Sequence, residues 1–230
     1  MAGQRKRSAG SFLASLRKDK SVNIAAVAAA LSESSSFIAQ VIDGLSSADH
    51  VYRYNCLRVS VVLAEEHPQL VDQHWEKLST MLTSPYSYQR AGAVSVLVPL
   101  ACHRAYSGEL LEAVRAMEGI FPAEATVNSR YILQGLGRIA AAVPPLREPI
   151  TEFLLGSVTA EKPNRELLRS DVIEAFAAFA DGLRDKERCI AYAANQVHSP
   201  SPRTRKASRD FLKCYGPSSA EAAGRTSAPR

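Results

Sequence analysis

The amino-acid sequence predicts an all-α protein in which short helices form pairs and the pairs stack along the chain as an α-solenoid. Three observations support this prediction. Apolar residues recur at helical spacing in consecutive short segments, turns rich in Ser and Pro separate these segments, and the pattern repeats every 36–40 residues. A period of this length is typical of a solenoid, because one helical pair cannot cover its own apolar face and its neighbours do so.

The chain begins with a basic segment, residues 1–20, that we expect to be flexible. Ser21 is a suitable N-cap for a helix that extends to Leu31, since Ile24 and Val27 begin one apolar stripe along it. We expect this helix to cap the N-terminal end of the stacked pairs.

About five helical pairs follow, each with an amphipathic first helix, a polar turn and a more apolar second helix. Pairs of residues that stop helices, such as His67-Pro68 and Pro144-Pro145, mark several boundaries. We expect one repeat domain over residues 21–216, with repeats at about 36–68, 69–105, 106–145, 146–183 and 184–216. The tail at 217–230 is small and polar, so we expect it to be disordered.

An arginine recurs at the start of each expected second helix, with successive spacings of 37, 40, 39 and 36 residues. The members of this arginine column are Arg53, Arg90, Arg130, Arg169 and Arg205. One interpretation is a structural ladder that fixes the stacking of the repeats. The other is that some of these planar guanidinium groups line a groove and hold a carboxylate or a phosphate.

Three segments, TSPYSYQRAGA, HSPSPRTRKAS and SSADHVYRYNC, resemble the turn and second-helix start of HEAT repeats. The resemblance covers residues 36–215 and implies a right-handed α-solenoid of about five HEAT-like pairs with an N-terminal capping helix. The family usually has Asp in this turn, where the chain has Ser47, Ser84 and Ser199. The ladder would therefore use serine hydroxyls or backbone carbonyls, or be absent. Armadillo repeats are the second choice.

Charge is segregated along the chain. Residues 1–20 hold six basic and one acidic residue, residues 201–230 hold seven and two, and the middle holds 15 and 20. Several of these cations lie on one face of the last expected helix, as a predicted anion patch of Arg203, Arg205, Lys206, Arg209 and Lys213. Such a patch can neutralise phosphates, whereas the alternative is a polar cap that keeps the terminal repeat in water.

The second expected inner helix is almost entirely apolar, which burial between two layers would explain. The alternative is a concave groove for a partner, with Val94, Val98 and Arg138 as candidate groove residues.

The four cysteines lie far apart and form no CxxC pair, so they suggest neither zinc nor a disulfide framework. We predict no catalytic residues, no cofactor and no metal.

The leading hypothesis for function is a non-enzymatic scaffold or adaptor that binds a protein partner on the concave face. The alternative is electrostatic binding of nucleic acid through the basic ends, and a DNA glycosylase-like or bilin lyase-like enzyme ranks third. We expect a chain without a membrane span and a cytoplasmic or otherwise intracellular location. The basic N-terminus leaves a transit peptide or a nuclear address as alternatives. Oligomeric state is left open.

Overall fold

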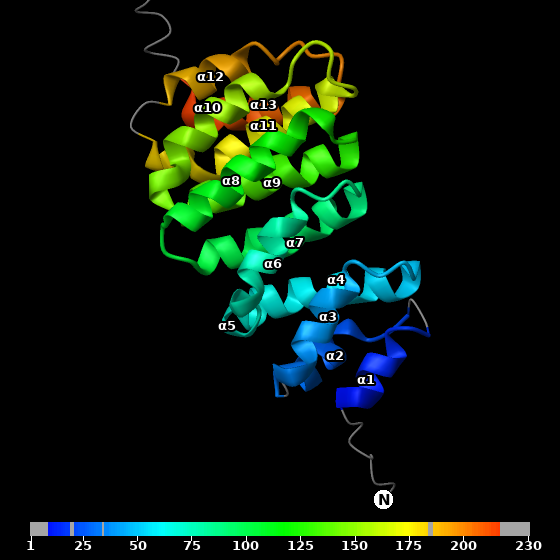
Figure 1. Ribbon diagram of the computed structural model, residues 1–230. Helices are drawn as coiled ribbons and strands as arrows, with labels where there is room; N and C mark the ends of the chain where they lie inside the picture. The colour runs from blue at the N-terminus through cyan, green and yellow to red at the C-terminus, as the bar shows by residue number, and fades with distance from the viewer. Residues whose placement is uncertain (1–8, 19–20, 34, 184–185, 217–230) are drawn as a thin grey trace, which may run out of the picture. The chain divides into compact units, whose positions relative to one another are not determined.

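The computed structural model describes residues 9–18, 21–33, 35–183 and 186–216, and all regular structure within these ranges is helical (Figure 1). The predicted all-α class is thereby confirmed. The expected disordered tail at 217–230 and the first eight residues lie outside the described residues. The chain divides into two compact units, Met1–Ile120 and Phe121–Arg230, which we call unit 1 and unit 2. The boundary falls inside the third expected repeat, between its two helices.

Unit 1 contains the described helices from the N-terminal segment to the first helix of the third expected repeat. They are α1 (Ala9–Ser15), α2 (Ile24–Ser32), α3 (Ile38–Gly44), α4 (His50–Glu66), α5 (Pro68–Val71), α6 (Trp75–Met81), α7 (Ser87–His103) and α8 (Gly108–Ile120). Helix α3 packs against α4, α6 packs against α7, and α4 also contacts both α2 and α7 (Figure 1). The two long helices α4 and α7 therefore form the centre of this unit.

Side chains at the helix ends explain these boundaries. Asn23 caps α2 by accepting from Ala26 N, so the cap lies two residues after the expected Ser21. Asp49 caps α4 by accepting from the backbone N–H groups of Val51 and Tyr52. These caps satisfy amide groups that have no partner within the helix.

The segment expected to be flexible contains a packed helix. Leu13 in α1 and Leu16 directly after its end are buried, and α1 packs against α2. The buried Asn55 side chain of α4 also donates to Leu16 O at 2.9 Å. Leu13 and Leu16 lie three residues apart on one helical face, which favours docking over a free basic arm. Residues 9–18 therefore belong to the packed part of unit 1.

Unit 2 consists of α9 (Thr126–Ala142), α10 (Arg147–Ser157), α11 (Arg165–Phe179), α12 (Glu187–Ala194) and α13 (Pro202–Tyr215). Helix α11 lies between α9 and α13 and contacts both. The contact with α9 is close, because a Cβ atom added at Gly137 would lie 2.8 Å from Ala175 Cα. Glycine at 137 thus permits the approach of two helix backbones.

Candidate interaction site

The arginine column has a common geometry in three of its five members. In each, Nη1 donates to the carbonyl oxygen of the serine six residues earlier, and the arginine lies four residues after the helix N-cap. The bonds are Arg53 to Ser47 O at 2.6 Å, Arg90 to Ser84 O at 2.7 Å and Arg205 to Ser199 O at 2.7 Å. Each of these arginines fastens the turn of its own helical pair.

The other two arginines lie one residue later relative to their caps, which are Ala125 and Asn164. This shift changes their partners. In α9 the fourth position is Ser129, whose hydroxyl donates to Glu124 O at 3.2 Å and so takes the place of the arginine. Arg169 instead donates to Glu166 Oε1 at 2.7 Å. The extra residues in the third and fourth turns account for the change in register.

Arg130 contributes to a polar network around Asp171, which is 0% exposed. Arg130 Nε donates to Asp171 Oδ2 at 2.8 Å and its Nη2 donates to Oδ1 at 3.2 Å. Gln134 and Arg203 also donate to Oδ1, at 2.8 and 3.3 Å. The hydrogen bond that Arg130 donates to Asp171 raises the pKa of the Arg130 guanidinium further. The network joins α9, α11 and α13, and its buried carboxylate is fully compensated.

Several cations of the predicted anion patch already have partners. Arg203 pairs with Asp171 and also with Glu174 Oε2 at 2.8 Å. Lys206 pairs with Asp210 at 2.5 Å, which raises the pKa of its ammonium group. Arg205 donates to turn carbonyls, whereas Arg209 and Lys213 are exposed on α13. Arg203 and Arg205 are therefore engaged at helix joints, whereas Lys206, Arg209 and Lys213 are exposed on α13.

The predicted groove residues do not lie together on an accessible surface. Val94 and Val98 are 2% and 4% exposed, so both belong to the core. Arg138 is exposed on α9, in the other unit. The apolar character of the second half of α7 reflects burial rather than an open groove, because residues 96–101 are buried without exception.

The third turn is held by Lys162, a buried lysine that sequence reasoning did not single out. Its Nζ donates to Phe121 O at 2.6 Å, Pro122 O at 3.1 Å and Glu124 O at 2.9 Å. Burial lowers the pKa of this ammonium group. The three carbonyls satisfy all three of its donors, so the arrangement fits a structural cation better than a nucleophile.

Exposed tyrosines form a surface that the sequence analysis did not predict. Tyr86 and Tyr88 stack with centroids 5.5 Å apart, and the Arg53 guanidinium lies 4.2 Å from the centroid of Tyr88. Arg58 lies over Tyr54 at 5.6 Å. We call these five residues, which lie in the first half of α4 up to Arg58 and around the start of α7, the aromatic patch. A signal existed, because Tyr54 and Tyr131 each directly follow an arginine of the column.

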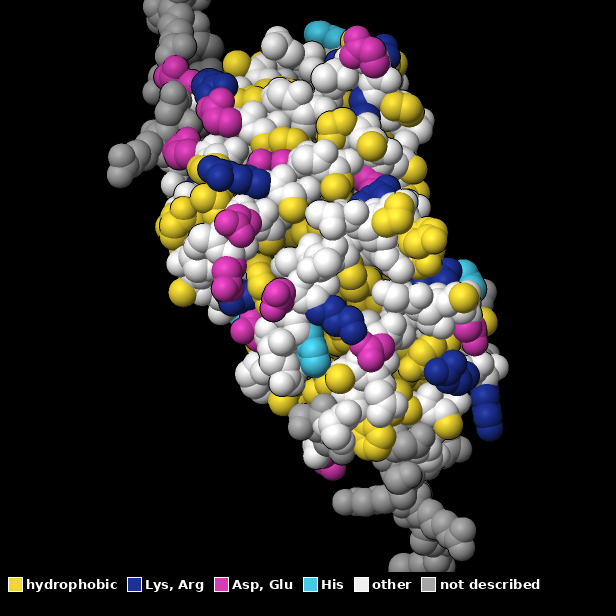
Figure 2. Space-filling model, viewed as in Figure 1, with side chains coloured by type: hydrophobic (Ala, Val, Ile, Leu, Met, Phe, Trp, Pro, Cys, Tyr) yellow, Lys and Arg dark blue, Asp and Glu magenta, His cyan; other side chains and the backbone are white. Residues whose placement is uncertain are grey.

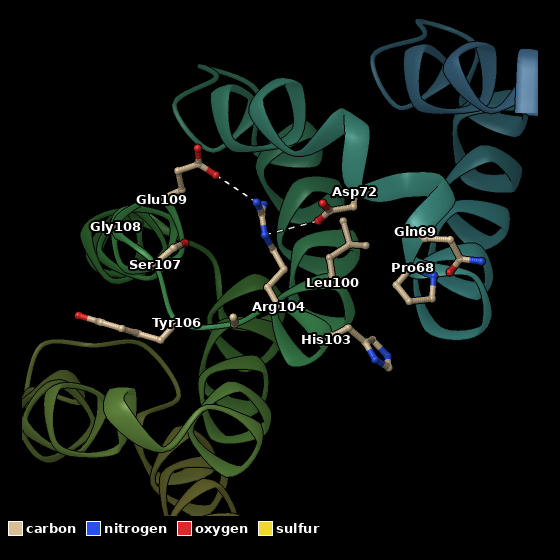
Figure 3. Close-up of a pocket in the computed structure, with 11 residues that line it drawn as sticks. Pro68, Gln69, Asp72, Leu100, His103, Arg104, Tyr106, Ser107, Gly108 and Glu109 are labelled. Carbon is tan, nitrogen blue, oxygen red and sulfur yellow. Dashed lines mark hydrogen bonds and ion pairs between the residues drawn. The ribbon is translucent and has the colours of Figure 1, made fainter.

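A hollow of about 830 Å³ opens in unit 1 between the end of α7 and the starts of α5 and α8. At its centre Arg104 extends between two carboxylates, Asp72 at 3.5 Å and Glu109 at 3.1 Å (Figure 3). The same guanidinium lies 4.1 Å from the Trp75 ring. Its positive charge is thus matched by acids and by a ring face, which leaves the hollow without a net cation to hold an anionic ligand.

Charge is mixed on the face of the molecule that Figure 2 draws. The face drawn in Figure 2 intersperses basic, acidic and apolar side chains. Within the described ranges, no group of three or more His, Cys, Asp and Glu is placed to hold a metal ion. None of the described helices is long and apolar enough to cross a membrane.

No protein-family model and no curated protein matches the chain. Among solved structures, the chain is similar to an engineered protein from the Northeast Structural Genomics Consortium, with a TM-score of 0.54 and 14% sequence identity. The match covers 91% of this chain and 92% of the engineered one. At this identity the likeness concerns the fold alone.

Proposed function

We propose that the chain is a non-enzymatic protein-interaction scaffold or adaptor whose helical pairs stack as a right-handed, HEAT-like α-solenoid. The recurrence of one arginine-to-turn bond in three pairs supports the repeat interpretation, since the same local joint is rebuilt at the expected period. The partner is a protein, and it contacts the ends of the second helices where these follow their turns.

One observation carries this proposal. Among the described residues, six large apolar side chains are exposed, and five of them lie at the start of a second helix or in the turn before it. These five are Tyr54, Tyr86 and Tyr88 in unit 1, and Val127 and Tyr131 in unit 2. Tyrosine and arginine are enriched among the residues that dominate binding energy in protein interfaces.

Photo-crosslinking tests the proposal with a matched control. A photoreactive phenylalanine analogue replaces Tyr86, which is 57% exposed, or Tyr106, which is 49% exposed but lies in the loop before α8. We expect protein adducts from position 86 and none from position 106. The absence of protein adducts at 86 would contradict the proposal. Nucleic-acid adducts there would support the alternative of an electrostatic nucleic-acid binder.

A further inference from the structure

The two chain segments that carry the aromatic patch contain basic residues and no acid. The first nine residues of α4, from His50 to Arg58, contain two arginines, a histidine and no acid. The segment 84–90, which ends with Arg90, likewise contains no acid. The nearest acid in sequence is Asp49, and its Oδ1 already accepts from two amides of α4. A partner that fits this surface by charge is therefore acidic.

The patch is also ordered before any partner arrives. Tyr88 contacts both the Tyr86 ring and the Arg53 guanidinium, and Arg53 Nη1 is fixed on Ser47 O. Side chains that are already held in place lose less conformational freedom on binding. A guanidinium stacked on a ring keeps its in-plane N–H groups directed sideways, in the geometry that suits a carboxylate.

Nucleic acid fits these features less well. Single-stranded nucleic acid is bound by many cations along its backbone and by open ring faces on which bases stack. The patch itself contains two arginines and no lysine. The ring of Tyr88 already has two stacking partners. A few charges beside tyrosines suit a short peptide in which acidic and apolar side chains alternate.

We propose that the aromatic patch of unit 1 binds an acidic protein segment, with carboxylates at its arginines and apolar side chains against its tyrosines. This inference rests on the proposed function, since it names the chemistry of the partner at the same site. It specifies that the partner segment is negatively charged, whereas the proposed function specifies no charge.

Fluorescence anisotropy with the full chain tests the inference. The probes are a labelled peptide in which Glu alternates with Tyr, the same peptide with Lys for every Glu, and a thymidine oligonucleotide. We expect the acidic peptide to bind and the lysine peptide to bind at least about tenfold more weakly. We expect Kd for the acidic peptide to rise with salt, because exposed charges are screened.

Two variants and a control locate the binding. Tyr86→Ala and Arg58→Glu should each weaken the acidic peptide by about tenfold or more. Tyr106→Ala removes another exposed tyrosine of unit 1, 49% exposed and outside the patch, and should leave Kd unchanged. Circular dichroism checks that the variants remain folded, as expected for exposed positions.

The inference is overturned if the lysine peptide or the oligonucleotide binds better than the acidic peptide, or if the patch variants bind like the parent. The crosslinking experiment then distinguishes failure of this inference from failure of the proposed function. Protein adducts at position 86 without acidic-peptide binding reject the chemistry of the partner and retain the proposed function. Loss of both rejects the proposed function as well.

Discussion

Asp171→Asn should destabilise unit 2 by about 3 kcal/mol, within the range for breaking a buried ion pair. The carboxylate accepts two bonds from Arg130 and one each from Gln134 and Arg203. Asparagine retains one acceptor and turns an NH₂ group toward arginine or glutamine donors. Because the Arg130 side chain is 29% exposed, water recovers part of its lost solvation. This recovery holds our estimate at the lower end of the range.

Glu174→Gln is the matched control. Glu174 pairs with the same Arg203, yet both side chains are more than two-fifths exposed, at 44% and 42%. An exposed pair contributes about 0–1 kcal/mol. The same chemical change should therefore have very different consequences at positions 171 and 174, three residues apart on α11.

Urea unfolding combined with hydrogen exchange of α9 and α11 amides measures the difference. Exchange resolves the two helices, which matters because the chain has two compact units and need not unfold in one step. A double-mutant cycle of Asp171→Asn with Arg130→Gln should give a coupling energy of about 2 kcal/mol, within the usual range for residues in contact. If Asp171→Asn destabilises no more than Glu174→Gln, the network does not join the helices as described.

Three further predictions concern the joints and the core. Arg90→Met should destabilise unit 1 by about 1–2 kcal/mol, because the bond to Ser84 O is lost. Its control, Arg115→Met on the exposed side of α8, should destabilise by under about 0.5 kcal/mol. Equal effects of the two variants in urea unfolding would contradict a fastening role for Arg90. Gly137→Ala should destabilise unit 2 by about 1–3 kcal/mol, because the added Cβ would meet Ala175. Gly92→Ala, whose Cβ would have open space around it, should stabilise unit 1 by up to about 1 kcal/mol. A gain in stability from Gly137→Ala would refute the close contact. Burial raises the pKa of Tyr192 from 10.0 to about 12, so its contribution to stability is full below pH 10 and is lost between pH 10 and 12. Tyr192→Phe should reduce this alkaline loss of stability by about 2–3 kcal/mol. An unchanged pH profile of unfolding in the variant would refute this prediction.

The sequence predicted the helices well because its signals there are local. The stop signal at His67-Pro68 predicted the end of a helix, and the structure has α4 end at Glu66. The arginine column was informative for the same reason in the three pairs whose turns have the same length, because there each arginine lies at the same distance from its helix N-cap. It misled at Arg130 and Arg169, because one extra residue before each changes which side chain reaches the turn carbonyl.

Features that depend on contacts between distant segments were not predictable in this way. The sequence of an apolar helix such as α7 has the same pattern whether the helix lies between layers or lines a groove. Only the structure shows that Val94 is in the core. Asp171 and Lys162 bond to groups about 40 residues away, at separations of 41 and 38–41. No periodic pattern identifies such pairs, because each occurs once.

The third turn, in unit 2, is fastened differently from the turns of unit 1. In unit 2 the third turn is tied down by Lys162, and Asn164 bonds to Thr126 at 2.9 Å. These bonds occupy the polar groups of the turn internally. In unit 1 the arginines fasten the turns locally, and Tyr86 remains 57% exposed beside them. A local joint leaves neighbouring side chains available, so a repeat fastened by its own arginine can stabilise the fold and display a binding surface at the same point.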